Sequence, residues 1–151
     1  MVPGDGSGRH MDGGPVSIAG TYRVVSVERM TDDGEIREPF GPDPEGFLLY
    51  GPDGMMAAVV GASARPLLGL DLLAETVSAS DGDLAAAFRA AYGFVGSYEV
   101  TGSTVVHHLM ASTVPNWVGT EQVRPFTLDG DELVLRPPGW RVVGRRTRAA
   151  G

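Results

Sequence analysis

Hydrophobic and polar residues alternate along much of the chain from residue 20 onward, and this period of two is typical of β-strands. In the first such segment, GTYRVVSVER, the alternation places Tyr22, Val24 and Ser26 on one face. Seven further segments follow, separated by turn-forming Gly, Pro, Asp and Asn residues. The predicted strands are 20–29, 47–50, 55–60, 95–100, 104–112, 120–128, 132–136 and 140–146.

One segment has a helical period instead. Leu84, Phe88 and Tyr92 lie at intervals of four residues, and Asp83 suits the positive N-terminal end of a helix. We therefore expect one short helix from about Asp81 to Tyr92, inserted after the third strand, packed by its single apolar stripe against a surface and covering one end of the domain. The apolar segment before it, LLGLDLL, is interpreted as a flap over an opening.

Eight short strands joined mostly by tight turns predict an all-β fold, and an eight-stranded antiparallel up-and-down barrel is their simplest arrangement. Closing the sheet removes the exposed edge strands that an open sheet would leave. Eight strands enclose room for packed side chains or one small ligand. Residues 1–15, rich in Gly and Pro, are interpreted as a flexible leader, which leaves His10 out of any site, and the domain is expected to span residues 16–148.

The stretch from Thr104 to Leu128 carries most of the candidate chemistry. In its second half, Gln122 and Arg124 share a face with Phe126 and Leu128, two residues that favour a core. An inward Arg is costly unless it is paired or the interior contains water. The pattern therefore predicts a cavity with polar side chains on its wall.

Two interpretations of Arg124 stay open. In the first, Arg124 and Gln122 form a catalytic clamp that polarises a carbonyl or enolate oxygen of an apolar ligand. In the second, Arg124 is structural and stacks on an aromatic ring such as Tyr22 or Trp117. The neighbouring Asn116 either shapes the mouth of the cavity together with Trp117 or satisfies turn backbone, and the second role is favoured.

His107 and His108 are adjacent in a predicted strand, so their side chains point to opposite faces. Only one of them can line the cavity as a catalytic acid, base or hydrogen-bond donor, and the alternation does not decide which. For either residue a purely structural role is the more common case. Neither a third histidine nor a close pair of carboxylates accompanies them, so no metal site is expected.

Aromatic and methionine side chains suit a cavity for a flexible, unsaturated molecule, because Tyr and Trp offer one polar atom and Met adapts to irregular shapes. About half of these candidates are expected to contact the ligand and the others to fill the core. The candidate ligand-binding residues are Tyr22, Ser26, Tyr50, Met55, Met56, Tyr92, Tyr98, Asn116, Trp117, Gln122 and Phe126.

The composition excludes several kinds of chemistry. The chain has no Cys and no Lys, which excludes thiol catalysis, disulfides, thiolate metal sites and Schiff bases. A net charge of −7 argues against a nucleic-acid partner. We see neither a secretory signal nor an apolar run near the ~20 residues of a membrane span, so a cytoplasmic protein without membrane contact is expected. No cofactor motif is present, and no cofactor is expected.

Five segments together resemble the bacterial lipocalin-like domain family: GTYRVVSVE, FGPDPEGFLLYGPDG, GSYEVTGSTVVHH, PNWVGTEQVRPF and LDGDELVLRPP. The resemblance covers about Gly20 to Pro138, and its most specific part is PNWVG-x-x-Q-x-R. It implies a calycin-type barrel with a cavity for a small apolar molecule.

The resemblance also implies how one end of the barrel is closed. Gly20-Thr21-Tyr22 stands where the family usually has Gly-x-Trp, so this chain has Tyr in place of Trp. In the wider calycin group that aromatic residue closes the barrel, often under an Arg from the last strand. The candidates for this Arg are Arg141, Arg145 and Arg146.

Related small barrels encoded near polyketide pathways act as cofactor-free cyclases, so two hypotheses of different classes follow. The favoured one is a cofactor-independent cyclase or isomerase, pericyclase-like, which acts on an apolar polyketide-like substrate through a shaped cavity and one or two hydrogen-bond donors. The alternative is a non-catalytic carrier or sequestering protein. Both have a small hydrophobic molecule as partner, a homodimer stays open, and the sequence does not separate the two.

Overall fold

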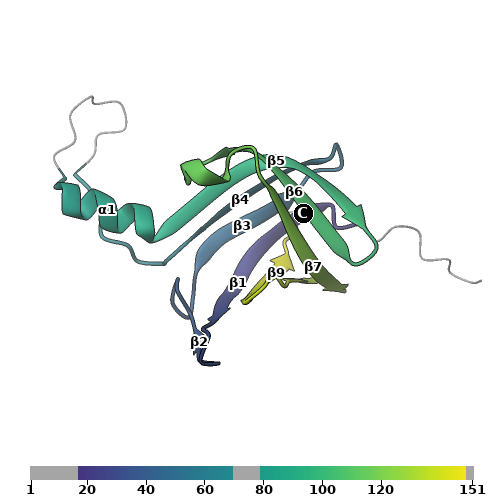
Figure 1. Ribbon diagram of the computed structural model, residues 1–151, viewed down its shortest axis with the longest axis horizontal. Helices are drawn as coiled ribbons and strands as arrows, with labels where there is room; N and C mark the ends of the chain where they lie inside the picture. Colours follow the sequence, from purple (N-terminus) through teal and green to yellow (C-terminus); the bar gives the residue numbers. More distant parts are fainter. Residues whose placement is uncertain (1–16, 70–78, 149–151) are drawn as a thin grey trace, which may run out of the picture.

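The structure, a computed structural model, describes residues 17–69 and 79–148. Each strand of the barrel pairs antiparallel with the next one along the chain, and β1 also pairs with β9, which closes the sheet (Figure 1). The predicted all-β, eight-stranded antiparallel barrel is therefore confirmed. Its strands are β1 (Gly20–Met30), β3 (Glu45–Tyr50), β4 (Met55–Gly61), β5 (Ala91–Thr101), β6 (Thr104–Ser112), β7 (Glu121–Asp129), β8 (Glu132–Leu135) and β9 (Trp140–Arg146).

Two predictions fall on parts of the chain outside the described residues. They are the flexible leader with His10 and the larger part, residues 70–73, of the predicted flap LLGLDLL. Both stay predictions. Among the residues that are described, no helix is long and apolar enough to cross a membrane.

The start of β5 differs from the prediction. β5 begins at Ala91 because Ala91, Tyr92 and Gly93 pair with residues 59–61 of β4. The helix α1 (Asp81–Arg89) therefore ends earlier than expected, and its predicted extension to Tyr92 was wrong. Hydrogen bonding to β4 and burial inside the barrel outweigh the helical spacing of the apolar residues. Tyr92 consequently belongs to a barrel strand.

The helix α1 covers the barrel only in part. Ser80 caps it, because the Ser80 hydroxyl accepts a hydrogen bond of 3.1 Å from the backbone N–H of Asp83. None of the α1 residues is buried, and α1 projects beside the barrel in Figure 1. Only Phe88 and Arg89, in its last turn, reach the cavity described below. The expected short helix therefore covers this end of the barrel with its last turn alone.

Two short elements were not predicted. The strand β2 (Ile36–Arg37) pairs with Arg29 and Met30 at the end of β1. The 3-10 helix η1 (Pro115–Trp117) lies in the predicted loop between β6 and β7. This turn of helix determines where Trp117 lies, next to the inner surface of the barrel.

Tyr22 and Arg146 close one end of the barrel. The hydroxyl of Tyr22 accepts a 2.7 Å hydrogen bond from Arg146 Nη2 and donates one of 2.9 Å to the carbonyl of Ile18. The guanidinium carbon of Arg146 lies 5.3 Å from the centre of the Tyr22 ring. A Cβ on Gly20, whose φ is +146°, would lie 3.2 Å from Arg146 Nε, so glycine leaves room for that side chain. Of the three candidate arginines, Arg146 is the one above Tyr22.

The inner faces of the strands form one apolar core between this closed end and the opposite, open end. Alternation along β4 illustrates the arrangement: Met56, Ala58 and Val60 are buried, whereas Val59 is exposed. The predicted inward face of β7 is confirmed, since Phe126 is buried and Val123 is exposed. The polar residues of β7 that lie just before Phe126 therefore face the interior at the open end.

Candidate functional site

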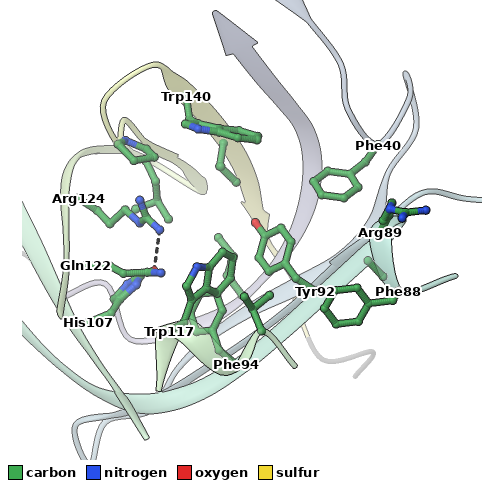
Figure 2. Close-up of a pocket in the computed structure, with 16 residues that line it drawn as sticks. Phe40, Phe88, Arg89, Tyr92, Phe94, His107, Trp117, Gln122, Arg124 and Trp140 are labelled. Carbon is green, nitrogen blue, oxygen red and sulfur yellow. Dashed lines mark hydrogen bonds between the residues drawn. The ribbon is translucent and has the colours of Figure 1, made fainter. Parts of the chain in front are cut away.

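A cavity of about 460 Å³ occupies the open half of the barrel. This volume lies within the range of pockets that hold small organic ligands. Side chains from strands, loops and the last turn of α1 form its wall (Figure 2). The lining residues are Phe40, Leu48, Phe88, Arg89, Ala91, Tyr92, Phe94, His107, Val114, Trp117, Gln122, Arg124, Leu135, Pro137, Trp140 and Val142.

Aromatic rings make up much of the wall. Trp117 packs edge-on against Tyr92 and Phe94, with ring centres 5.4 and 6.0 Å apart. Phe40 lies 5.6 Å from Tyr92, and Trp140 contributes a further ring from β9. Trp117 and Trp140 are the only two tryptophans of the chain, and both line this cavity. A wall of this kind fits a flat, largely apolar molecule.

Gln122 and Arg124 form the polar part of the wall. They are inward-facing neighbours on β7, and Arg124 Nη2 donates a hydrogen bond of 2.6 Å to Gln122 Oε1 (Figure 2). The predicted inward orientation of Arg124 is therefore confirmed. Burial lowers the pKa of Arg124 from its ordinary value, but a guanidinium remains charged in proteins.

No charged partner neutralises Arg124 within the described part of the chain. The ion pairs there all involve other residues, so Arg124 has no carboxylate within 4 Å. The alternative of a purely structural stacking is not supported either, because the arginines that lie over aromatic rings in residues 17–69 and 79–148 are Arg23, Arg29 and Arg146. Gln122 is the one side chain that accepts a hydrogen bond from Arg124 in the described residues.

His107 is the inward member of the histidine pair and lies beside Gln122. It is almost completely buried, and its Nε2 is 2.7 Å from the hydroxyl of Tyr50. Burial raises the pKa of Tyr50, so the phenol keeps its proton and needs an acceptor. Nε2 is therefore the acceptor, and the proton of the neutral imidazole sits on Nδ1.

The environment keeps His107 uncharged. Burial, and after it the positive charge of Arg124, lowers the pKa of His107 to about 3, although Gln122 acts in the opposite direction. Gln122 stands directly across from His107 in the ladder between β6 and β7. Nδ1 is buried and makes no hydrogen bond of normal geometry with any described residue. His107 is thus a weak base near neutral pH, placed between Tyr50 and Gln122.

His108 lies on the outer wall, which corrects its candidacy as a catalytic residue. Its imidazole Nδ1 is 3.1 Å from a carboxylate oxygen of Glu121, and its Nε2 is 4.0 Å from one of Glu99. The adjacent side chains of a strand must point to opposite faces, so the inward position of His107 puts His108 outside.

Ser26 is not on the cavity wall, because a β-bulge interrupts the alternation of β1. Val24 pairs with Gly144, but the next pair is Ser26 with Val143, so β1 contains one extra residue there. The bulge turns Val27 inward instead, and Val27 is buried. The expectation that Ser26 binds the ligand is corrected for this reason.

The two adjacent methionines also differ from the prediction. Met55 points outward and is 38% exposed, whereas Met56 points inward and is buried in the core. Met55 pairs with Ser97 near the closed end, and Met56 likewise lies below the cavity. Neither methionine lines the cavity.

The remaining candidates fill the barrel without lining the cavity or lie outside it. Tyr22, Tyr50 and Phe126 are buried in the core, and Tyr98 donates a 2.7 Å hydrogen bond to the carbonyl of Gly51. Tyr50 acts on the cavity only through His107. Asn116 is exposed, in agreement with a role in the turn. Of the expected ligand-binding residues, Tyr92, Trp117 and Gln122 line the cavity.

Several lining residues were missed. Phe40 lies in the Pro-rich loop that was expected near a barrel mouth, and Trp140 is the first residue of the last predicted strand. Phe94 was not among the candidates because β5 was expected to begin after it. Arg89 lies in the last turn of α1, where nothing in the local pattern marks it as a cavity residue.

Comparison with known proteins agrees with this architecture. The sequence model of the lipocalin-like domain matches residues 19–145. A solved structure of a protein from Bacteroides eggerthii has a TM-score of 0.50 at 14% identity, over 87% of this chain and 100% of the other. A lipocalin-like protein from Bacteroides uniformis has a TM-score of 0.48 at 15% identity, over 85% and 97%. None of the curated proteins matches the sequence.

Proposed function

We propose that this chain, which belongs to the lipocalin-like domain family, binds one small and largely apolar molecule in its barrel cavity and holds an oxygen atom of that molecule at Arg124. The fold is consistent with small-ligand binding. Arg124 adds the position at which a polar group of the ligand would lie.

The observation that carries the proposal is the unneutralised charge of Arg124 in an aromatic-walled cavity. A charged side chain that leaves water without a partner costs several kcal/mol. Evolution retains such a cost where the group has a task, and a ligand oxygen would offset it. The amide nitrogen of Gln122 is a second donor group at the same place.

The finer activity that we propose is a cofactor-independent cyclisation or isomerisation of a polyketide-like substrate. Arg124 and Gln122 would stabilise negative charge that develops on a substrate carbonyl or enolate oxygen, and the aromatic wall would select the reactive conformer. His107 lies next to Gln122, opposite it in the ladder between β6 and β7. Its depressed pKa favours a reaction without proton abstraction, such as a pericyclic ring closure, because the described residues of the cavity wall offer no other base.

The second candidate is a carrier or sequestering protein. The described residues of the cavity wall include no carboxylate, which favours this candidate because binding alone needs no proton transfer. A carrier releases its ligand unchanged, whereas an enzyme releases an isomer.

Incubation with linear polyene and enone compounds of the polyketide type separates the two. Native mass spectrometry reports whether a compound binds, and chromatography with ultraviolet detection reports whether it is converted into an isomer of equal mass. Conversion by the wild type that falls about 10²–10³-fold in Arg124→Met supports the enzyme. Binding without conversion supports the carrier, and no binding of any compound refutes the proposed polyketide-like substrate. A cytoplasmic location and a homodimer are further proposals, which cell fractionation and light scattering test.

A further inference from the structure

The charge of the cavity is opposite to that of the whole molecule. The chain has a net charge of −7, yet the part of the cavity wall formed by described residues contains Arg89 and Arg124 and not one Asp or Glu. Nineteen acidic residues are available, so this distribution needs a reason. The chemistry of the ligand can provide this reason, because the charges of the cavity wall act on the molecule inside the cavity.

The two arginines occupy different depths. Figure 2 shows Arg124 beside Gln122 and His107 at one side of the cavity, and Arg89 at the opposite side next to Phe88. Arg124 is half-buried, whereas Arg89 is exposed in the last turn of α1. One positive charge therefore lies inside and the other stands at the rim, where it attracts molecules of negative charge.

The hydrogen-bonding groups around Arg124 are almost all donors. Gln122 Oε1 already accepts a hydrogen bond from Arg124, and the Gln122 amide also has two N–H donors. The guanidinium retains further N–H groups without a partner among the described residues. His107 carries its proton on Nδ1 and adds no acceptor. A neutral carbonyl oxygen has two lone pairs, whereas a carboxylate has about four and also cancels the charge.

We propose that the ligand is an organic anion, a carboxylate on a flat apolar body, whose oxygens bind the guanidinium of Arg124 and the amide nitrogen of Gln122. The apolar body lies between the rings of Trp117, Tyr92 and Trp140. This inference rests on the proposed binding function and narrows it to one chemical class.

The test compares 2-naphthoate with 2-naphthamide, a neutral compound of nearly the same shape. Isothermal titration calorimetry at pH 7 measures both affinities for the full chain. We expect the acid to bind about 10- to 100-fold more tightly, the range expected for one or two charge-assisted hydrogen bonds. The comparison needs no substitution, so it does not depend on a variant that folds.

Two variants locate the effect. Arg124→Met removes the inner charge and should abolish the preference for the acid while it keeps binding of the amide. Arg145→Gln is the matched control, because Arg145 lies on the outer wall, 3.9 Å from Glu132, and should leave the preference unchanged. Loss of the preference in Arg145→Gln as well would place the effect in the overall charge of the protein and overturn the inference.

The outcomes separate this inference from the proposed function. Equal affinity of the wild type for acid and amide overturns the anion inference and leaves binding in the cavity intact. If the acid, the amide and the neutral ketone 2-acetonaphthone all fail to bind, the proposed binding function fails and the inference fails with it.

Discussion

Each end of the barrel has an arginine beside tyrosines, but the surroundings of the two charges differ. At the closed end, Arg146 lies over the ring of Tyr22 and donates to its hydroxyl. At the open end, Arg124 bonds to the neutral amide of Gln122 and faces a cavity. Arg146 packs on Tyr22 and closes the barrel, although its buried Nε makes no hydrogen bond with a described residue, whereas Arg124 turns its donors toward a cavity. The comparison shows that the available partners, and not the residue type, decide whether a buried arginine is structural or fit to bind a ligand.

The largest loss of stability is expected from a substitution at the closed end. Tyr22→Ala removes a fully buried ring and leaves Arg146 without its main partner, so we expect a loss of about 3–5 kcal/mol of unfolding free energy. Urea denaturation followed by circular dichroism measures it. A loss below about 1 kcal/mol would show that the closed end contributes little, and the contrast between the two ends would disappear.

Tyr50 lies between the two ends of the barrel. Loss of its hydroxyl should lower the unfolding free energy less than loss of the Tyr22 ring. Tyr50→Phe leaves Nε2 of His107 buried without its donor, which is expected to cost about 1–3 kcal/mol of unfolding free energy. The same denaturation experiment applies. We also expect weaker ligand binding, because the tautomer of His107 beside Gln122 is no longer fixed. An unchanged unfolding free energy would contradict the assigned hydrogen bond.

The neutral state of His107 predicts a pH dependence. The folded protein holds the pKa of His107 at about 3, below its ordinary value of 6.5, so the unfolded chain takes up a proton first as the pH falls. Between these values His107 should remove about 1.4 kcal/mol of unfolding free energy for each pH unit of acidification. His107→Asn should lose this contribution. His108→Asn, on the outer wall, is the control and should keep it.

The smallest effect is expected on the outer wall. Met55→Thr changes a side chain that is 38% exposed, and we expect a change within about 0.5 kcal/mol. Met56→Ala, one residue further and buried, should cost about 2–5 kcal/mol. Equal effects of the two substitutions would mean that β4 has a different register from the one described here.

Local alternation was sufficient to predict the barrel and its inward arginine. A period of two depends only on neighbouring residues, so the inward face that contains Gln122, Arg124 and Phe126 was read correctly. The same rule required that His107 and His108 point in opposite directions, but it did not decide which points inward. That choice depends on the partner strand, where Gln122 lies opposite His107.

The rest of the site depends on contacts between distant residues. Tyr92 looked helical from its spacing with Phe88, yet pairing with β4 draws it into β5. The bulge near Ser26 arises from pairing with β9, more than a hundred residues away in the sequence. Phe40 and Trp140 enter the cavity because loops and strand ends converge at the open end. Local patterns contain no information about such pairings.

Arg124→Met tests the central claim most directly, when its thermal unfolding midpoint and its affinity for 2-naphthoate are measured together. If the unpartnered charge of Arg124 exists for a ligand, its replacement by an apolar side chain should leave the midpoint unchanged or raise it. Affinity for the acid should fall about 10- to 100-fold in the same sample. A midpoint lowered by several degrees, with unchanged affinity of the folded fraction, would show that Arg124 is structural like Arg146 and would contradict the account.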